Sequence, residues 1–349
     1  MTARLEVPDA GVRVAADIGG THARFATVAD APQQLGDVAC LRCADYQTIG
    51  DAFRTWLGTL GNRRVERICV SVAGPVVGDR VDLPNSPWTL SRTGLEAELG
   101  VELTVINDFM AQALSVDALG VDDVTWIGAP RPSDRPGVQA ILGPGTGLGV
   151  ALRTAHGDIL PSEGGHVSFA PSTPHEIALL RCLVPRYGRV SSERLLSGPG
   201  LENLFRANRE LDGCPAPGDG DEPCAATIAA RAEAGDPLAR RAVTDFFDIL
   251  ASYAGDVALF AESTGGVFLS GGVLRKLSAF LDPDRFRQRF EDKGRMAPLC
   301  RTMPVGWISH PYPGLLGCAA LLARPVAGQA GGAPPAPGAG RTMASGGRA

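Results

Sequence analysis

The sequence predicts an α/β protein with a duplicated architecture, and three features support this prediction. Apolar segments typical of strands alternate with segments whose apolar residues recur at helical spacing. The pattern of a strand, a turn of glycine and threonine, and a second strand occurs twice, around residues 17–21 and 143–149. The chain has 349 residues, more than one hydrophobic core usually needs, so we expect two domains.

The first half begins with a strand rich in Val, Ala and Ile, followed by the pair Gly19-Gly20. Glycine weakens a strand and packs no side chain, so this pair indicates a turn whose backbone approaches a ligand closely. Another strand is followed directly by Asn107-Asp108, and the ends of strands are where α/β sheets place ligands. In this half the periodicity predicts strands over residues 12–18, 23–28, 65–72 and 103–106, and helices over 48–60, 93–99 and 109–119.

The pattern restarts at residue 138 with a strand, a glycine turn and a second strand. Here we expect strands over 138–142, 150–153 and 266–270, and helical segments over 182–187, 202–208, 225–234, 237–261 and 315–323. The last stretch, 324–349, consists largely of Gly, Ala and Pro, so we expect a disordered tail there.

Composition excludes several classes of protein. The net charge is −5 and there is no long basic block, so neither nucleic acid nor an anionic membrane is an expected partner. No run of 18 apolar residues and no secretory segment is present, and eight cysteines are scattered along the chain, so we expect reduced thiols and a cytoplasmic protein. Cys40 and Cys43 form one C-x-x-C, but without a second pair or nearby histidines we expect no zinc site.

The stretch GPGTGLG, residues 143–149, matches neither a Walker A loop nor a G-x-G-x-x-G dinucleotide fingerprint. It is either a flexible hinge or a turn that binds phosphate. A hinge would not explain Thr146 among the glycines or the apolar strands on both sides. Backbone amides and a hydroxyl suit phosphate oxygens, so we favour the phosphate turn.

Asn107-Asp108 has two interpretations. A carboxylate at this position could accept a proton from a substrate hydroxyl. Asn or Asp directly before a helix also serves routinely as its N-cap, and on this pair alone the cap is the better supported interpretation.

Glu163, His166 and Glu193 lie in two polar, glycine-rich segments. Together with an amide they offer the donors and acceptors that sugar hydroxyls require, although Glu193 taken alone is more simply an exposed capping residue. Gly271-Gly272 ends a strand, and it either makes a plain turn into a helix or admits a flat ring such as adenine.

Taken in order, eight stretches between residues 12 and 323 resemble the bacterial glucokinase family of the actin-like ATPase superfamily. Eight collinear matches are far more specific than any single glycine turn. They are DIGGTHARFA, VAGPVVGDRVDLPNSPW, INDFMAQA, LGPGTGLGVA, SEGGHVSFAP, SERLLSGPGLENLFRA, FLSGGV and HPYPGLLGCAALL.

The resemblance implies a two-domain actin-like ATPase (ribonuclease H-like) fold with a cleft between a small and a large domain. The small domain would comprise residues 12–119 plus 310–323, and the large domain residues 120–309. It also implies an enzyme, a glucokinase that transfers phosphate from ATP to the 6-hydroxyl of glucose, and a homodimer.

Site roles carry over from the family motifs to matching positions. Asp108 would be the general base that takes the proton from the glucose 6-hydroxyl. The remaining sugar hydroxyls would be held by Asn107, Glu163, His166 and Glu193. ATP and its phosphates would meet Asp17, Gly19, Gly20, Thr21, Gly145, Thr146, Gly147, Gly271 and Gly272, with Asp17 directed toward Mg²⁺ through water.

Two alternatives remain. One is a hexokinase that prefers another sugar, because discrimination between epimers depends on contacts that the sequence does not place. The other is a non-catalytic sugar sensor on the same fold, although Asp17, Asp108 and Thr146 are all present. The zinc-binding cysteine cluster of the related repressor–ORF–kinase group is not matched, which leaves His166 free for sugar.

Overall fold

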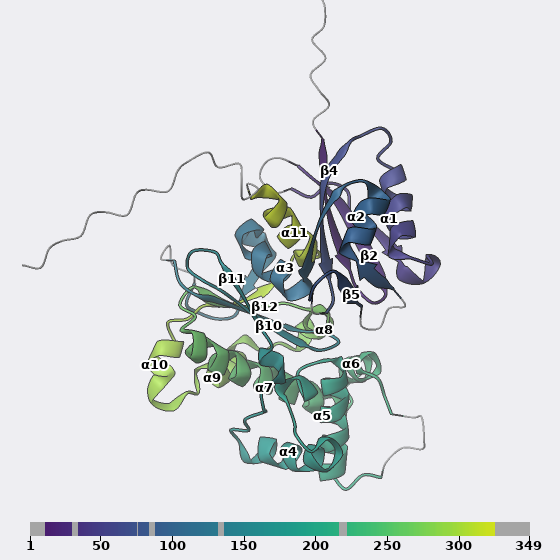
Figure 1. Cartoon of the computed structure of the whole chain (residues 1–349). Helices are drawn as coiled ribbons and strands as arrows, with labels where there is room; N and C mark the ends of the chain where they lie inside the picture. Colours follow the sequence, from purple (N-terminus) through teal and green to yellow (C-terminus); the bar gives the residue numbers. More distant parts are fainter. Residues whose placement is uncertain are drawn as a thin grey trace, which may run out of the picture.

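The fold is built around two β-sheets, as the computed structural model in Figure 1 shows. The structure describes residues 11–29, 34–74, 76–83, 88–131, 136–215 and 222–324. The predicted tail, apart from residue 324, and residues 84–87 of one family motif lie outside this part of the chain.

The first sheet has five strands in the order β3-β2-β1-β4-β7. Its first three strands are antiparallel neighbours, whereas β1, β4 and β7 run parallel. Parallel strands end at the same edge, so the residues that follow β1 and β7 lie at one edge of this sheet. The strands are β1 (Val12–Ile18), β2 (His22–Val28), β3 (Ala39–Arg42), β4 (Val65–Val72) and β7 (Glu102–Asn107).

The second sheet has six strands in the order β11-β10-β9-β12-β13-β8. Its first five strands repeat the directions of the first sheet, with two antiparallel pairings followed by two parallel ones, and β8 adds an antiparallel edge. The duplication predicted from the two glycine turns is therefore present in the strand order. The strands are β8 (Val124–Trp126), β9 (Gln139–Pro144), β10 (Leu148–Arg153), β11 (Ile159–Ser162), β12 (Gly266–Leu269) and β13 (Val305–Ile308).

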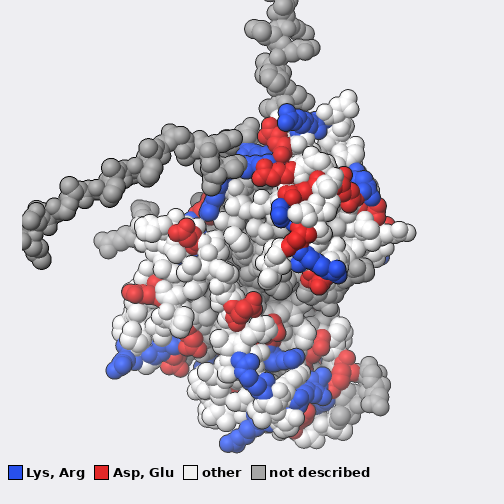
Figure 2. Space-filling model, viewed as in Figure 1, with Lys and Arg blue, Asp and Glu red and all other residues white. Residues whose placement is uncertain are grey.

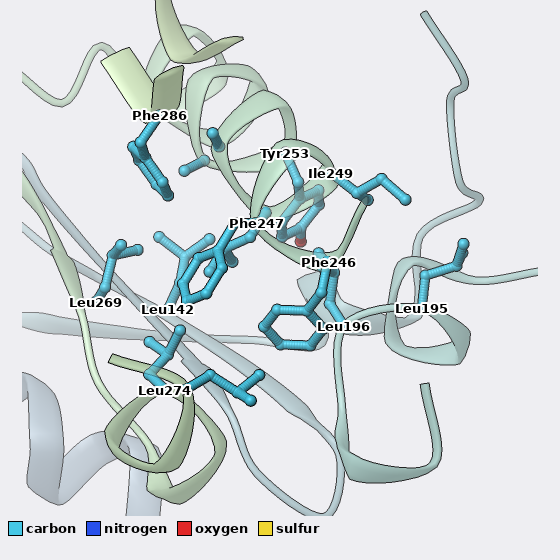
Figure 3. Close-up of a cluster of buried hydrophobic side chains, with 14 of the residues drawn as sticks. Leu142, Leu195, Leu196, Phe246, Phe247, Ile249, Tyr253, Leu269, Leu274 and Phe286 are labelled. Carbon is cyan, nitrogen blue, oxygen red and sulfur yellow. The ribbon is translucent and has the colours of Figure 1, made fainter. Parts of the chain in front are cut away.

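Helices cover one face of each sheet. Phe53, Trp56 and Leu95 bring α1 (Ile49–Gly58) and α2 (Arg92–Leu99) onto the first sheet. Against the second sheet, side chains of β9 and β12 pack with Phe246 and Phe247 of the long helix α7 (Figure 3). The helices of this larger cluster are α4 (Pro174–Tyr187), α5 (Gly198–Leu211), α6 (Ala225–Glu233), α7 (Pro237–Ala261), α8 (Gly272–Leu277), α9 (Pro283–Glu291) and α10 (Ala297–Cys300).

Two helices, α3 (Asp108–Ser115) and α11 (Pro313–Ala323), lie between the sheets (Figure 1). Ala111 and Leu114 of α3 share a buried cluster with α11 and the first sheet. Ala113, on another side of α3, packs into a cluster with strands of the second sheet. A side chain at Gly317 of α11 would collide with the Ala111 carbonyl, so glycine permits the close approach of the two helices. The N-terminus of α3 is thus positioned by both sheets.

Where the sequence signal was strong, the predicted boundaries are confirmed. β1, β4 and α7 have the predicted limits. Helix α7 begins where Asp236 accepts hydrogen bonds from the amides of Leu238 and Ala239, with Pro237 at the first helical position.

Other boundaries were wrong. Helix α5 begins at Gly198 rather than residue 202, because Ser197 caps the sequence Gly-Pro-Gly, which alone is typical of a turn. Helix α4 begins at Pro174 rather than residue 182, behind the cap Thr173. The prediction also missed several short elements, namely β3, β8, β11, β13, α8, α9, α10 and the hairpin β5 (Arg80–Asp82) and β6 (Thr89–Ser91).

Positive and negative side chains are interspersed on the face shown in Figure 2. Many are paired, such as Arg285 with Asp248 and Arg209 with Glu222. Within the described part of the chain, no helix is both long and apolar enough to cross a membrane.

Candidate active site

Asn107 closes the start of α3. Its side-chain oxygen accepts hydrogen bonds from the amides of Phe109 at 2.9 Å and Met110 at 3.4 Å. Its amide nitrogen donates to the carbonyl of Gly74 at 2.9 Å, which ties α3 to the end of β4. The capping interpretation is therefore confirmed for Asn107. The cap leaves one amide hydrogen of Asn107 for a ligand.

Asp108 is the first residue of α3, and its carboxyl group has a raised pKa of about 6. Burial is the main cause, and the negative charge of Asp17 adds to it. The Phe109 amide, which donates to Asp108 Oδ1 at 2.9 Å, lowers the pKa, as a helix N-terminus also does, but burial outweighs them. A carboxylate that titrates near neutral pH is suited to general base catalysis.

Asp17 lies near the end of β1. Ser71 donates a hydrogen bond to Asp17 Oδ1 at 3.0 Å, and Arg24 lies 3.5 Å from Oδ2. Burial raises the pKa of this carboxyl, and Arg24 opposes the rise. A Cβ at Gly314 would lie 2.8 Å from Asp17 Oδ1, so glycine leaves room beside the carboxylate.

The turn between β1 and β2 is stabilised by hydrogen bonds within the turn and to Cys43. The Gly19 amide donates to the His22 carbonyl at 3.0 Å, the Thr21 carbonyl accepts from the Cys43 amide at 2.9 Å, and the Cys43 thiol donates to the Gly19 carbonyl. Gly20 is half-buried and Thr21 exposed. Because the Gly19 amide is used within the turn, a phosphate here would meet Gly20 and Thr21.

The predicted sugar-binding side chains Glu163, His166 and Glu193 come together. His166 lies 3.8 Å from a carboxylate oxygen of each glutamate. Glu193 is held by the Leu148 amide, which donates to its Oε2 at 3.0 Å, so Glu193 serves as more than an exposed cap. The Glu163 side chain is 85% exposed and remains available to a ligand.

Asn107 and Glu163 line one cavity of about 640 Å³, together with Phe109 and Leu148. This cavity lies between α3 and strands β10 and β11 of the second sheet. Asp108, at the start of α3, and Glu193, bonded to Leu148, flank residues of its lining. A polar small molecule here would meet the Asn107 amide and the Glu163 carboxylate, and the His166 imidazole lies 3.8 Å from that carboxylate.

The turn of residues 143–149 is held by two backbone hydrogen bonds at Gly145. The Gly145 amide donates to the Gly147 carbonyl, and the Gly145 carbonyl accepts from Gly198 at the start of α5, both at 2.8 Å. A Cβ at Gly147 would lie 2.4 Å from Glu193 Oε2, whereas the space at Gly145 is open. Gly147 therefore faces the sugar-binding group, and Gly145 and Thr146 face the other way.

A second cavity, of about 310 Å³, lies on that other side. Three predicted ATP-binding residues, Gly145, Thr146 and Gly272, line it, and its walls are mostly apolar, as a purine ring requires. Gly271 has a φ of +116°, and a Cβ there would lie 2.3 Å from the Pro144 carbonyl oxygen, so only glycine fits.

Sequence reasoning missed Glu202 and Lys276, which also line this cavity. Lys276 is one of only two lysines in the chain, a signal that could have drawn attention to it. It also missed Ser71, which holds Asp17, and Phe109, which packs against the turn. Nothing in the local sequence marks these two residues.

A family model described as Glucokinase matches residues 14–325. The chain belongs to the glucokinase family. It is 43% identical over 319 residues to a glucokinase of Stenotrophomonas maltophilia, covering 88% of this chain and 94% of that relative. The family predicted from the eight motifs is confirmed, and the chain is an enzyme of that family.

Solved structures of sugar kinases share this fold. The glucokinase from an Antarctic psychrotroph has a TM-score of 0.80 and 34% identity, covering 89% of this chain and 98% of its own. A ROK family glucokinase from Streptomyces griseus, in complex with glucose and AMPPNP, shares the fold with a TM-score of 0.61 and 21% identity, covering 89% of this chain and 99% of its own. The fold is that of the actin-like ATPase sugar kinases, as predicted.

Proposed function

We propose that this protein transfers the terminal phosphoryl group of ATP to the 6-hydroxyl of glucose, with Asp108 as the general base. The observation that carries the proposal is the position of Asp108. Its half-buried carboxylate, with a raised pKa of about 6, stands at the start of α3 between Asn107 and Phe109, which both line the larger cavity. The Stenotrophomonas relative is named a glucokinase, and the Streptomyces protein carries glucose and AMPPNP on this fold.

Glucose would occupy the larger cavity. Glu163, His166 and Glu193 would hold its hydroxyls from the side of the second sheet, and the free amide hydrogen of Asn107 from the side of α3. Carboxylates accept from hydroxyls and the amide donates to them, so the ring would be fixed in one orientation. This orientation would leave the 6-hydroxyl at Asp108.

Asp108 would then remove the proton from the 6-hydroxyl as its oxygen attacks the terminal phosphorus. The oxygen–phosphorus bond forms, the bond to the leaving ADP oxygen breaks, and the proton moves to the Asp108 carboxylate. Phosphoryl transfer depends chiefly on positioning and charge neutralisation, so a correctly placed base and fixed phosphates are the main requirements.

ATP would place its adenosine in the apolar cavity bordered by Gly271 and Gly272, and its phosphates at Gly145, Thr146 and Gly147. The turn of Gly19, Gly20 and Thr21 would face the phosphates from the first sheet. Mg²⁺ keeps several waters and is commonly bound by one or two carboxylates and the substrate phosphates. The Asp17 carboxylate, with room left beside it by Gly314, would hold it through water. Bound Mg²⁺ would neutralise phosphate charge.

Residues 12–119 plus 310–323 would move as a small domain, and residues 120–309 as a large one. The packing of α11 against β1 and β4 supports the assignment of the last helix to the small domain. The sugar contacts come from both parts, so glucose would draw them together across the cleft and exclude water.

We further propose that the protein is a homodimer in the cytoplasm. Light scattering on the purified protein would test the oligomeric state.

The decisive experiment supplies purified protein with MgATP and a panel of hexoses and measures ADP release. Glucose-dependent ADP with little response to mannose or fructose is expected. A stronger response to another hexose would contradict glucose as the substrate and favour the alternative hexokinase. Measurable glucose binding without ADP from any hexose would favour the sensor.

The role of Asp108 is tested by Asp108→Asn, which keeps the shape of the side chain but cannot act as a base. Turnover should fall at least about 10²-fold while glucose still binds, as judged by calorimetry. Asp122→Asn, a change at an exposed aspartate, is the matched control. Near-normal turnover in Asp108→Asn would overturn the assignment.

A further inference from the structure

We propose that Phe109 is a positioning residue whose ring, seated over Gly143 and Gly149, fixes the start of α3 against the turn of Gly145 and Thr146. This inference rests on the proposed role of Asp108 as the base. In this role the Phe109 side chain sets the distance between the Asp108 carboxylate and the phosphates bound at Gly145 and Thr146.

The first observation is a glycine pair in the second sheet. Gly143 of β9 and Gly149 of β10 stand opposite each other in the antiparallel ladder that carries the turn. A Cβ at Gly149 would lie 1.8 Å from Cε2 of Phe109, and a Cβ at Gly143 would lie 2.6 Å from its Cε1. The ring thus fills the space that two side chains would otherwise occupy.

These two glycines are therefore explained by Phe109 rather than by phosphate. Real Cβ atoms do not approach other atoms within 3.0 Å, so any other residue at Gly143 or Gly149 would displace the ring. Aromatic rings that cover glycine in a strand also restore packing that glycine lacks. The size of the side chain at position 109 matters as well, because a smaller one would leave an unfilled space over the glycine pair.

The second observation is that the backbone of Phe109 holds the proposed base. Its amide donates to Asp108 Oδ1 and to Asn107 Oδ1, each at 2.9 Å. Phe109 thus contacts both groups. Its amide donates a hydrogen bond to the proposed base, and its ring packs on the two glycines that flank the phosphate-binding residues. Gly145 and Thr146, which we assign to the phosphates, follow Gly143 by two and three residues, so a shift of the ring would move the base relative to the phosphates.

Phe109 also belongs to a hydrophobic cluster with Phe268, so a purely structural role is the competing interpretation. The two roles differ in kinetics. Loss of packing lowers stability, whereas loss of positioning lowers kcat, because a displacement of about 1 Å can cost about 10²-fold in rate.

The test compares Phe109→Leu with Phe268→Leu, the same change in the same cluster but on β12. Phe109→Leu should lower kcat at least tenfold with KM for glucose changed less than about threefold, whereas Phe268→Leu should lower Tm with kcat near that of the parent. If both variants lose kcat equally, or if Phe109→Leu changes only KM, the inference is overturned. If Phe109→Leu does not fold, Phe109→Met, which keeps more of the volume, takes its place with the same expectations.

A double-mutant cycle gives an independent result. Gly149→Ala should lower kcat, because the added methyl group overlaps the ring. In combination with Phe109→Ala, which removes the ring, the methyl group has room, so the double variant should lose less kcat than the product of the two single effects. Strictly multiplicative losses would overturn the inference.

The same experiments separate this inference from the proposed function. If the Asp108→Asn variant is active, Asp108 is not the base, and both the proposed function of this residue and the role of Phe109 are overturned. An inactive Asp108→Asn variant together with parental kcat in Phe109→Leu would leave the base in place and overturn only the role of Phe109.

Discussion

The carboxylate of Glu193 accepts a hydrogen bond from the backbone amide of Leu148 at a distance of 3.0 Å. Leu148 begins β10, directly after the turn that carries Thr146 and Gly147. His166 lies 3.8 Å from the other oxygen of the same carboxylate. The group that we assign to glucose and the turn that we assign to the phosphates are therefore joined through one side chain.

Gly147→Ala tests this connection. The new methyl group would lie 2.4 Å from Glu193 Oε2, so the carboxylate must move away from its place beside His166. KM for glucose should rise about tenfold, which is roughly the loss of affinity expected when one hydrogen bond to a charged group is lost. The change in KM for ATP should be smaller. Steady-state kinetics with each substrate varied gives both values.

The matched control for this variant is Gly58→Ala at the end of α1, where an added Cβ meets nothing within 4 Å. Its kinetics should equal those of the parent. Parental KM for glucose in Gly147→Ala would show that the turn and the sugar group are independent.

Thr146→Val should affect ATP more than glucose, the reverse of Gly147→Ala. Thr146 lines the apolar cavity with Gly145 and Gly272, and valine keeps its shape but removes the hydroxyl. KM for ATP should rise more than KM for glucose, because only the phosphate loses a hydrogen-bond donor. A change confined to glucose would show that the cavity does not hold the nucleotide.

The raised pKa of Asp108 predicts opposite effects of pH on activity and stability. The base must be ionised, so kcat/KM for glucose should fall as the pH drops through about 6. In the folded state the carboxyl binds its proton more tightly than in the unfolded chain, so folding loses stability as the pH rises from about 4 to about 6.

Asp108→Asn removes this ionisation. The variant should be more stable than the parent at pH 7, where the parent holds a buried charge, and the difference should shrink toward pH 4. Urea denaturation of both proteins across this range measures the free energy of unfolding. A variant that is less stable than the parent at pH 7 would show that Asp108 is not penalised by burial.

Much of the fold could be predicted because its buried segments have clear patterns. The limits of β1 and β4 follow from segments in which apolar residues predominate, and those of α7 from its cap, its proline and its periodicity. Strands such as β3 and β11 could not be predicted, because they are short and largely exposed and exist only through pairing with a neighbour.

The candidate site was predicted in a similarly uneven way. Polar residues at strand ends, such as Asp17 and Asn107, stand out in an apolar context. The role of Phe109 depends on a contact with strands more than 30 residues away, and a phenylalanine in a helix looks like any core residue. Likewise, Gly147 and Gly149 are alike in sequence, yet one faces Glu193 and the other faces Phe109.

Binding of glucose should make the molecule more compact. Asn107 approaches the larger cavity from the end of β7 in the first sheet, whereas Glu163 approaches it from beyond β11 in the second. A sugar that bonds to both would draw the two parts together, as ligands do in hinge closure. Small-angle scattering at saturating glucose should give a smaller radius of gyration than the free protein, and Glu163→Ala should show a weaker change at equal occupancy. An unchanged scattering curve at saturation would mean that the sugar site is already closed, so that water must be excluded from the phosphates without movement of the two parts.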